Sequence, residues 1–202
     1  LLGRFQHEDI SDSSVQAMMG RYGADPKQAE RVVSTAQHLF DGVAKKLNLN
    51  SDDSDLLRRA AYLHEIGLAI SHSGYHKHSA YLLQHSDIAG FSQIDQNHLS
   101  HLVAHHRRKL RSDARIDALR VGGNKLVYLC LLLRLAVLLN HSRSDEMLPA
   151  IELQAVNEQQ WQLSVSGDAK QWPLLVADLH DEQVQFKHWD IELNIQSEQF
   201  IN

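Results

Sequence analysis

The residues best suited to chemistry in this chain are His64 and Glu65, which are adjacent and followed by a glycine. Leu57, Ala61, His64 and Leu68 recur at steps of four, three and four, the spacing of one helix face, so His64 is predicted to point into the core. An imidazole beside a carboxylate is a donor pair that divalent metals use. The alternative is a buried histidine that only bonds to a backbone carbonyl.

Histidines are also concentrated in one part of the sequence. The chain has 14, and nine of them lie between His64 and His106. His98, His101 and His105 share one helical face, because they are spaced i, i+3 and i+7. This clustering raises a metal hypothesis, since imidazole binds zinc, iron and nickel. For most of these histidines, an exposed or internally hydrogen-bonded ring is the alternative.

Charge is divided unevenly along the chain, although the net charge is only −5. Residues 105–125 carry seven basic and two acidic side chains, a net charge of +5 with histidine neutral. Residues 145–202 carry two basic and eleven acidic side chains, a net charge of −9. An anionic ligand is therefore expected on the first segment, the alternative being two solvated faces of opposite sign.

Apolar periodicity predicts that helices fill the first two thirds of the chain. Asp25 and Pro26 are a typical helix start, and the sequence from Val121 to Asn124 predicts a loop because it contains two glycines. The expected helices are residues 15–22, 26–43, 51–68, 76–84, 92–108 and 125–141, the last one being the central core helix.

After Pro149 the pattern changes to the alternation of β-strands. Asn157 and Glu158 between the first two strands predict a hairpin. The expected strands are residues 151–155, 161–165 and 189–195, with a helix around residues 173–181 before the last strand. The predicted fold is mainly α, a helical core at residues 1–148 with a small antiparallel β-sheet in an α+β subdomain at residues 149–202.

Four segments resemble, in order, the signatures of an HD-type phosphohydrolase domain: residues 28–32, 63–67, 105–106 and 134–137. In active members of that superfamily these segments supply a His, a His-Asp pair and a final Asp as metal ligands. Here Gln28, Glu65 and Val137 stand at three of those places, and only His64 is unchanged. Valine cannot bind a metal, and activation of water needs several anchoring ligands, so we expect no metal at these positions. A metal-dependent HD phosphohydrolase acting on a nucleotide or a phosphate ester is the alternative.

Arg134 needs a partner, because a charge within an apolar helix is costly when it is unpaired. Its place in the last HD-like segment predicts that it faces Glu65. We therefore expect an ion pair between Arg134 and Glu65 to replace the metal as the polar centre of the core.

A closer resemblance covers nearly the whole chain and is carried by four segments, residues 2–9, 63–68, 76–83 and 132–140. They look like the C-terminal region of bacterial exopolyphosphatases and guanosine pentaphosphate phosphohydrolases. The resemblance implies that the hydrolytic residues, and the magnesium they use, belong to two actin-like domains that precede this region. It also implies that this region binds inorganic polyphosphate and forms a homodimer. The chain begins at Leu1 without an initiator Met, so we expect a fragment of a longer polypeptide. The resemblance implies that this fragment has no catalytic residue or cofactor of its own.

The predicted ligand site is the basic segment, because guanidinium groups match phosphate oxygens in a two-pronged geometry. This chain departs from the family pattern at residues 10–13, where relatives often have arginines, so no phosphate contact is expected there. The predicted ligand-binding residues are Arg107, Arg108, Lys109, Arg111, His105, His106 and His78.

Composition favours some partners over others. Few aromatic residues lie among the basic ones, so nucleic acid is not the expected ligand. The longest apolar run, Leu126 to Leu139, is shorter than the ~20 residues that a bilayer requires, and it contains Arg134. One cysteine, Cys130, and the lack of a leader favour the cytoplasm, with peripheral attachment to the inner membrane as a further expectation for the parent protein. A structural interaction domain without any ligand is a third alternative.

Overall fold

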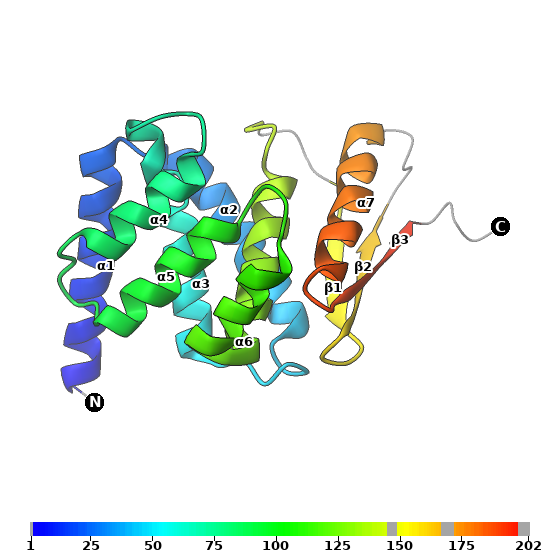
Figure 1. The fold of residues 1–202 in the computed structure, drawn as a ribbon, viewed down its shortest axis with the longest axis horizontal. Helices are drawn as coiled ribbons and strands as arrows, with labels where there is room; N and C mark the ends of the chain where they lie inside the picture. Colours follow the sequence, from blue (N-terminus) through cyan, green and yellow to red (C-terminus); the bar gives the residue numbers. More distant parts are fainter. Residues whose placement is uncertain (1, 145–148, 167–171, 198–202) are drawn as a thin grey trace.

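The computed structural model describes residues 2–144, 149–166 and 172–197. Helices form one side of the molecule and a three-stranded sheet with one helix forms the other, with α6 between them (Figure 1). Most of the chain is helical and the sheet is small, which confirms the predicted fold class. In chain order the elements are α1 Leu2–Tyr22, α2 Pro26–Val43, α3 Ser51–Leu63, the 3₁₀ helix η1 Ile66–Ala69, α4 Tyr75–His85, α5 Gln93–His105, α6 Ser112–Leu139, β1 Ile151–Ala155, β2 Gln160–Val165, α7 Pro173–Lys187 and β3 Glu192–Ser197.

Local capping signals fix where several helices begin. Asp25 caps α2 by accepting hydrogen bonds from the first backbone N–H groups of the helix, and Pro26 occupies its first turn. Asn50 with Asp53 at α3 forms a capping box, in which each side chain accepts from the other residue's backbone N–H. Ser92 forms the equivalent box at α5. These boundaries agree with the sequence prediction because they depend on neighbouring residues alone.

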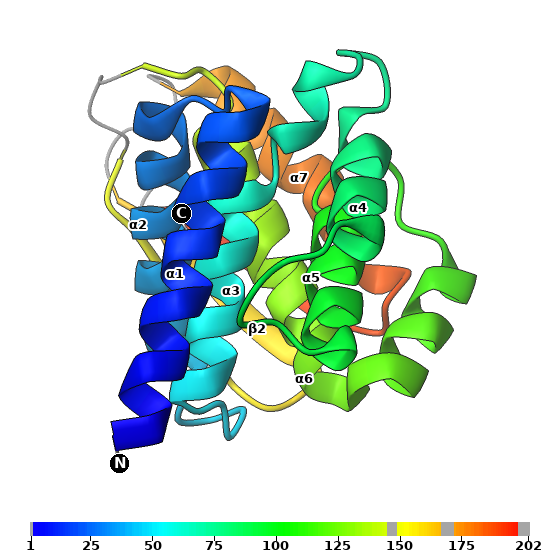
Figure 2. The same ribbon diagram turned by 90° about the vertical axis from the view of Figure 1, so that its left-hand side faces the viewer.

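The start of α1 differs from the prediction. The helix already includes Leu2, whereas the predicted helix began at residue 15. Ser11 Oγ donates to the carbonyl of Gly90 and Ser14 Oγ to that of Ala89. These serines therefore tie α1 to the loop before α5, and Figure 2 shows α1 lying across α3.

The predicted loop from Val121 to Asn124 is shorter than expected. Within Ser112–Leu139, two helices meet at a kink, and only Gly123, with φ of 68°, departs from helical geometry there. The half of α6 after the kink is buried almost all round and packs against α2, α3 and α5. By length and composition α6 would be able to cross a membrane, but 61% of its most apolar window is buried inside the protein, as expected of a core helix.

The sheet has the strand order β1-β2-β3. Strands β1 and β2 form the predicted antiparallel hairpin, with Leu153 opposite Leu163. Strand β3 pairs with β2 in parallel, with Ile195 opposite Leu163, so the prediction of a fully antiparallel sheet is wrong. The reason is α7, which carries the chain back along the sheet between β2 and β3, and such a crossover places two strands in parallel.

One continuous core joins the helices to the sheet. The fully buried Trp161 of β2 lies 5.8 Å, between ring centroids, from both Tyr128 of α6 and Phe186 of α7. The predicted domain boundary lies between residues 148 and 149, directly after a segment outside the described residues, and it stays a prediction.

The contact between α2 and β1 leads to a stability prediction that contrasts two glycines. A Cβ on Gly42 would overlap the carbonyl oxygen of Leu153, whereas a Cβ on Gly20 in α1 meets no atom within 4 Å. We expect Gly42→Ala to lower the free energy of unfolding by about 1–3 kcal/mol, because the strand must move away from the helix. Gly20→Ala is expected to raise it by about 0.5–1 kcal/mol through helix propensity. Urea denaturation of both variants measures these changes, and a stabilised Gly42→Ala protein would contradict the close contact.

Candidate functional site

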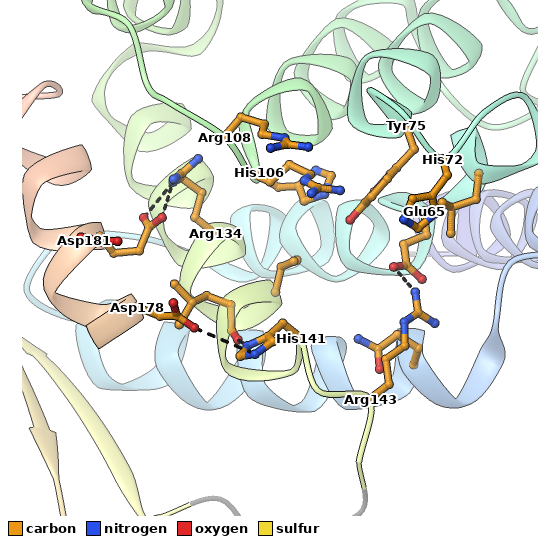
Figure 3. A pocket seen from close by; sticks show the side chains of 16 residues that line it. Glu65, His72, Tyr75, His106, Arg108, Arg134, His141, Arg143, Asp178 and Asp181 are labelled. Atoms are coloured by element: carbon orange, nitrogen blue, oxygen red, sulfur yellow. Dashed lines mark hydrogen bonds and ion pairs between the residues drawn. The ribbon is translucent and has the colours of Figure 1, made fainter. Parts of the chain in front are cut away.

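A pocket of about 410 Å³ lies between the helical core and α7 (Figure 3). Its wall combines residues from the end of α2's first turn, the α3–η1 junction, the start of α4, the loop after α5, the end of α6 and one face of α7. No single segment of sequence contributes more than a few of these residues. The pocket is therefore a product of tertiary packing.

Three of the four predicted degenerate metal positions line this pocket: Gln28, Glu65 and Val137. The fourth, His64, is 1% exposed and lies behind the wall, its ring centroid 5.3 Å from that of His106. The structure thus brings together the residues that the HD resemblance selected. Among the described residues, no three His, Cys, Asp or Glu side chains are grouped so that they hold a metal ion.

Gln28 is committed to structural hydrogen bonds. Its Nε2 donates to the carbonyl of Asn140 at 2.8 Å, and its Oε1 accepts from Arg31. The amide therefore joins the start of α2 to the residue that follows α6.

The local path of the chain around His64 depends on Gly67 and Ser79. Ser79 Oγ donates to the carbonyl of His64 at 2.9 Å and accepts from the N–H of Gly67 at 2.8 Å. A side chain at Gly67 would overlap the backbone of α4, so only glycine allows η1 to approach α4 this closely. These contacts hold Glu65 at the rim of the pocket.

The predicted ion pair between Arg134 and Glu65 is wrong. Arg134 instead donates to both carboxylate oxygens of Glu182 on α7, at 3.0 Å from Nε and 2.5 Å from a terminal nitrogen, and to the carbonyl of His105. Glu65 pairs with Arg143, which also reaches Asp25. The core arginine therefore points toward α7, whose proximity was not evident from the sequence.

The two buried histidines at the pocket, His106 in its wall and His64 behind it, are held neutral. Nδ1 of His64 lies 2.6 Å from the carbonyl of Ala61, and Nδ1 of His106 lies 2.6 Å from that of Val103, so each Nδ1 carries the proton. Burial lowers the pKa of His64, and burial together with the neighbouring His64 lowers that of His106 well below the ordinary value. In both rings Nε2 is buried without a hydrogen-bond partner among the described residues.

Two of the predicted basic residues, Arg107 and Arg108, line the pocket. The guanidinium of Arg107 lies over the ring of Tyr75, 4.5 Å from its centroid, which is a cation–π contact. Arg108 is exposed and has a φ of 68°. Neither forms an ion pair with an acid in the part of the chain that the structure describes, so both are open to an anion.

The other predicted residues have different places. His106 lines the pocket with the two arginines, but Lys109, Arg111, His105 and His78 do not. Arg111 pairs with Asp113 on the surface, and His105 packs against Trp189. Because successive residues of a chain point in different directions, a run of basic letters does not form one surface.

Sequence reasoning missed several residues that line the pocket, among them the aspartates of α7. Asp178 and Asp181 are spaced i, i+3 on α7, a signal for one helix face that was available in the sequence. His141 and Arg143 directly follow the core helix and also line the pocket. His72 belongs to the loop before α4, and nothing in its sequence surroundings distinguishes it.

Comparisons with known proteins agree with the helical fold class. The chain belongs to the Ppx/GppA phosphatase family: residues 10–183 match the model described as "Ppx/GppA phosphatase, domain III". This confirms the resemblance to exopolyphosphatases and guanosine pentaphosphate phosphohydrolases.

Individual relatives give the same result. The chain is 33% identical over 187 residues to a guanosine-5'-triphosphate,3'-diphosphate pyrophosphatase of Pseudoalteromonas translucida, covering 92% of this chain and 37% of the relative. It is 36% identical over 164 residues to a protein of the same name from Vibrio cholerae, covering 81% of this chain and 32% of the relative. The chain therefore spans about a third of the length of the curated relatives it matches.

Proposed function

We propose that this chain is the polyphosphate-binding and dimerisation region of an exopolyphosphatase-like enzyme, which releases phosphate from inorganic polyphosphate or from guanosine pentaphosphate. Its relatives are about three times longer, which supports placing hydrolysis, and the magnesium it uses, in domains outside this sequence. The observation that carries the proposal is that two arginines, Arg107 and Arg108, line the pocket and form no ion pair with any acid among the described residues.

The chemistry of these arginines suits a phosphate polymer. Each guanidinium offers several N–H donors in a fixed plane, and a polyphosphate offers only oxygen acceptors and negative charge. The stacked position of Arg107 on Tyr75 holds its guanidinium in place, which reduces the entropy lost on binding. Binding that rests on such contacts is expected to weaken steeply as salt rises, because it releases counterions.

A titration with long-chain polyphosphate at 50 and 200 mM salt tests this proposal. We expect the double variant Arg107→Glu and Arg108→Glu to weaken binding by about 100-fold at the lower salt and to reduce the salt dependence. The matched control reverses Lys109 and Arg111, which lie outside the pocket wall, and is expected to weaken binding by less than about tenfold. Equal losses in the two variants would show that general charge, and not the pocket, binds the polymer.

The dimer is tested separately by analytical ultracentrifugation of the same 202 residues. We expect the mass of two chains at micromolar concentration. A single 22.9 kDa species would remove dimerisation from the proposed function and leave polyphosphate binding unaffected.

A further inference from the structure

The arginine loop, residues 106–111, follows α5 and contains both arginines of the pocket wall, Arg107 and Arg108. Its backbone is unusual, because Arg108 has a φ of 68°, in the left-handed region that disfavours any residue with a Cβ atom. A conformation of this kind persists where the surrounding structure holds it in place. Contacts from α7 and from the turn after α7 provide that support.

The end of the arginine loop is bound to α7 and to the turn after it. The N–H of Leu110 donates to Oε1 of Gln185 at 2.9 Å, and Leu110 is 1% exposed. The indole Nε1 of the buried Trp189 donates to the carbonyl of Arg111 at 3.0 Å. The carbonyl of Trp189 in turn accepts from Nε of Arg115, near the start of α6, at 2.8 Å. The end of the loop is therefore fixed between α7 and α6.

The start of the arginine loop is bound to the same helix through Arg134. This arginine donates to the carbonyl of His105, the last residue of α5, and its guanidinium is held by Glu182 of α7. Figure 3 shows Arg134 reaching toward α7. Glu182, Gln185 and Trp189 are spaced i, i+3 and i+7, which is the spacing of one helix face. One face of α7, continued into the turn after it, therefore holds both ends of the loop.

We propose that Gln185 and Trp189 are positioning residues for phosphate binding. Their hydrogen bonds hold the arginine loop in the backbone conformation that keeps both guanidiniums at the pocket. The inference rests on the proposed function, because it uses the same two arginines. Arg107 is also held by its contact with Tyr75, so loss of the loop contacts is expected to act mainly on Arg108. Without them the backbone at Arg108 relaxes from its positive φ, and the guanidinium leaves the pocket wall.

Titration of the full 202-residue chain with long-chain polyphosphate and with inorganic triphosphate, at 50 and 200 mM salt, tests the positioning role. Gln185→Met keeps the length of the side chain but removes the acceptor for Leu110. We expect it to weaken the binding of both probes by about tenfold, and to lower the salt dependence for polyphosphate by about one guanidinium contact. The matched control, Gln183→Met, removes a hydrogen bond from the same helix to the carbonyl of Leu193. It is expected to change binding by less than about twofold, because Leu193 lies outside the arginine loop.

A double-variant cycle separates positioning from a general loss of stability. In Arg108→Ala the guanidinium is already absent, so adding Gln185→Met is expected to change polyphosphate affinity by less than about twofold. Trp189→Phe removes the N–H that donates to Arg111 and is expected to give the same pattern, which provides a second test if the methionine variant folds poorly. Circular dichroism under the titration conditions shows whether each variant is folded.

The outcomes distinguish the positioning role from the proposed function. Equal losses on adding Gln185→Met with and without Arg108 would overturn the positioning role, as would unchanged binding in both Gln185→Met and Trp189→Phe. In either case polyphosphate binding by the unmodified chain leaves the proposed function standing. Triphosphate binding that depends on Gln185 and Arg108, without binding of the long polymer, would support the positioning role and remove the polymer. An unmodified chain that binds neither probe would overturn both.

Discussion

Replacing Arg134 with alanine is expected to lower the free energy of unfolding by about 3–5 kcal/mol. Arg134 is 2% exposed, and its guanidinium holds both carboxylate oxygens of Glu182, whose side chain is 12% exposed. Removing the cation leaves a carboxylate in a poorly solvated position and an unsatisfied carbonyl at His105. The loss should separate α7 from α6 first, because this pair is the main polar contact between them in the described residues. Urea denaturation followed by circular dichroism measures the change.

Two further variants distinguish the ion pair from simple loss of packing. The combined change Arg134→Met and Glu182→Leu removes both charges, and it should recover most of the stability lost in Arg134→Ala. Arg111→Ala breaks an ion pair between exposed side chains, Arg111 and Asp113, and should change stability by less than about 0.5 kcal/mol. A combined variant as unstable as Arg134→Ala would show that the shape of the arginine, and not its charge, is what the core needs.

Lowering the pH from 7 to 5 is expected to destabilise the protein by roughly 4 kcal/mol or more through its buried histidines. Burial lowers the pKa of His64 and His106, and it lowers those of His76 and His101 to about 4 and that of His105 to about 3. In the unfolded chain these rings titrate near 6.5, so below that pH the unfolded state binds more protons than the folded state. Their contribution to stability is therefore present above about pH 6.5 and is lost as the pH falls toward 4. A histidine that stays neutral to pH 5 in the folded state accounts for about 2 kcal/mol of this loss.

The same measurement on two histidine variants identifies the source of the effect. His106→Gln removes a buried ring, so the difference in stability between pH 7 and pH 5 should shrink by about 2 kcal/mol. His85→Gln changes an exposed ring and should leave the difference unaltered. Stability that is flat from pH 7 to pH 5 in the unmodified chain would show that water reaches the histidine cluster and lets it ionise.

The sequence by itself determined the features that depend on neighbouring residues. The start of α2 follows from Asp25 and Pro26, and the start of α3 from Asn50, because capping groups bond to the next few backbone N–H groups. The buried face of His64 followed from helical spacing, since a core stripe repeats every three or four residues. The family followed from ordered segments spread over the whole chain.

Only the tertiary structure decided which distant groups meet. Arg134 binds Glu182 and not Glu65, since α7 packs within reach of α6, and spacing along α6 contains no information about that approach. The parallel pairing of β3 with β2 likewise comes from the crossover through α7. Of the seven predicted binding residues, three line the pocket and four do not, for the same reason. Local hydrogen bonding determines where each helix or strand forms. Which side chain meets which partner depends on how these elements pack against one another. That packing is determined by the burial of apolar side chains throughout the core.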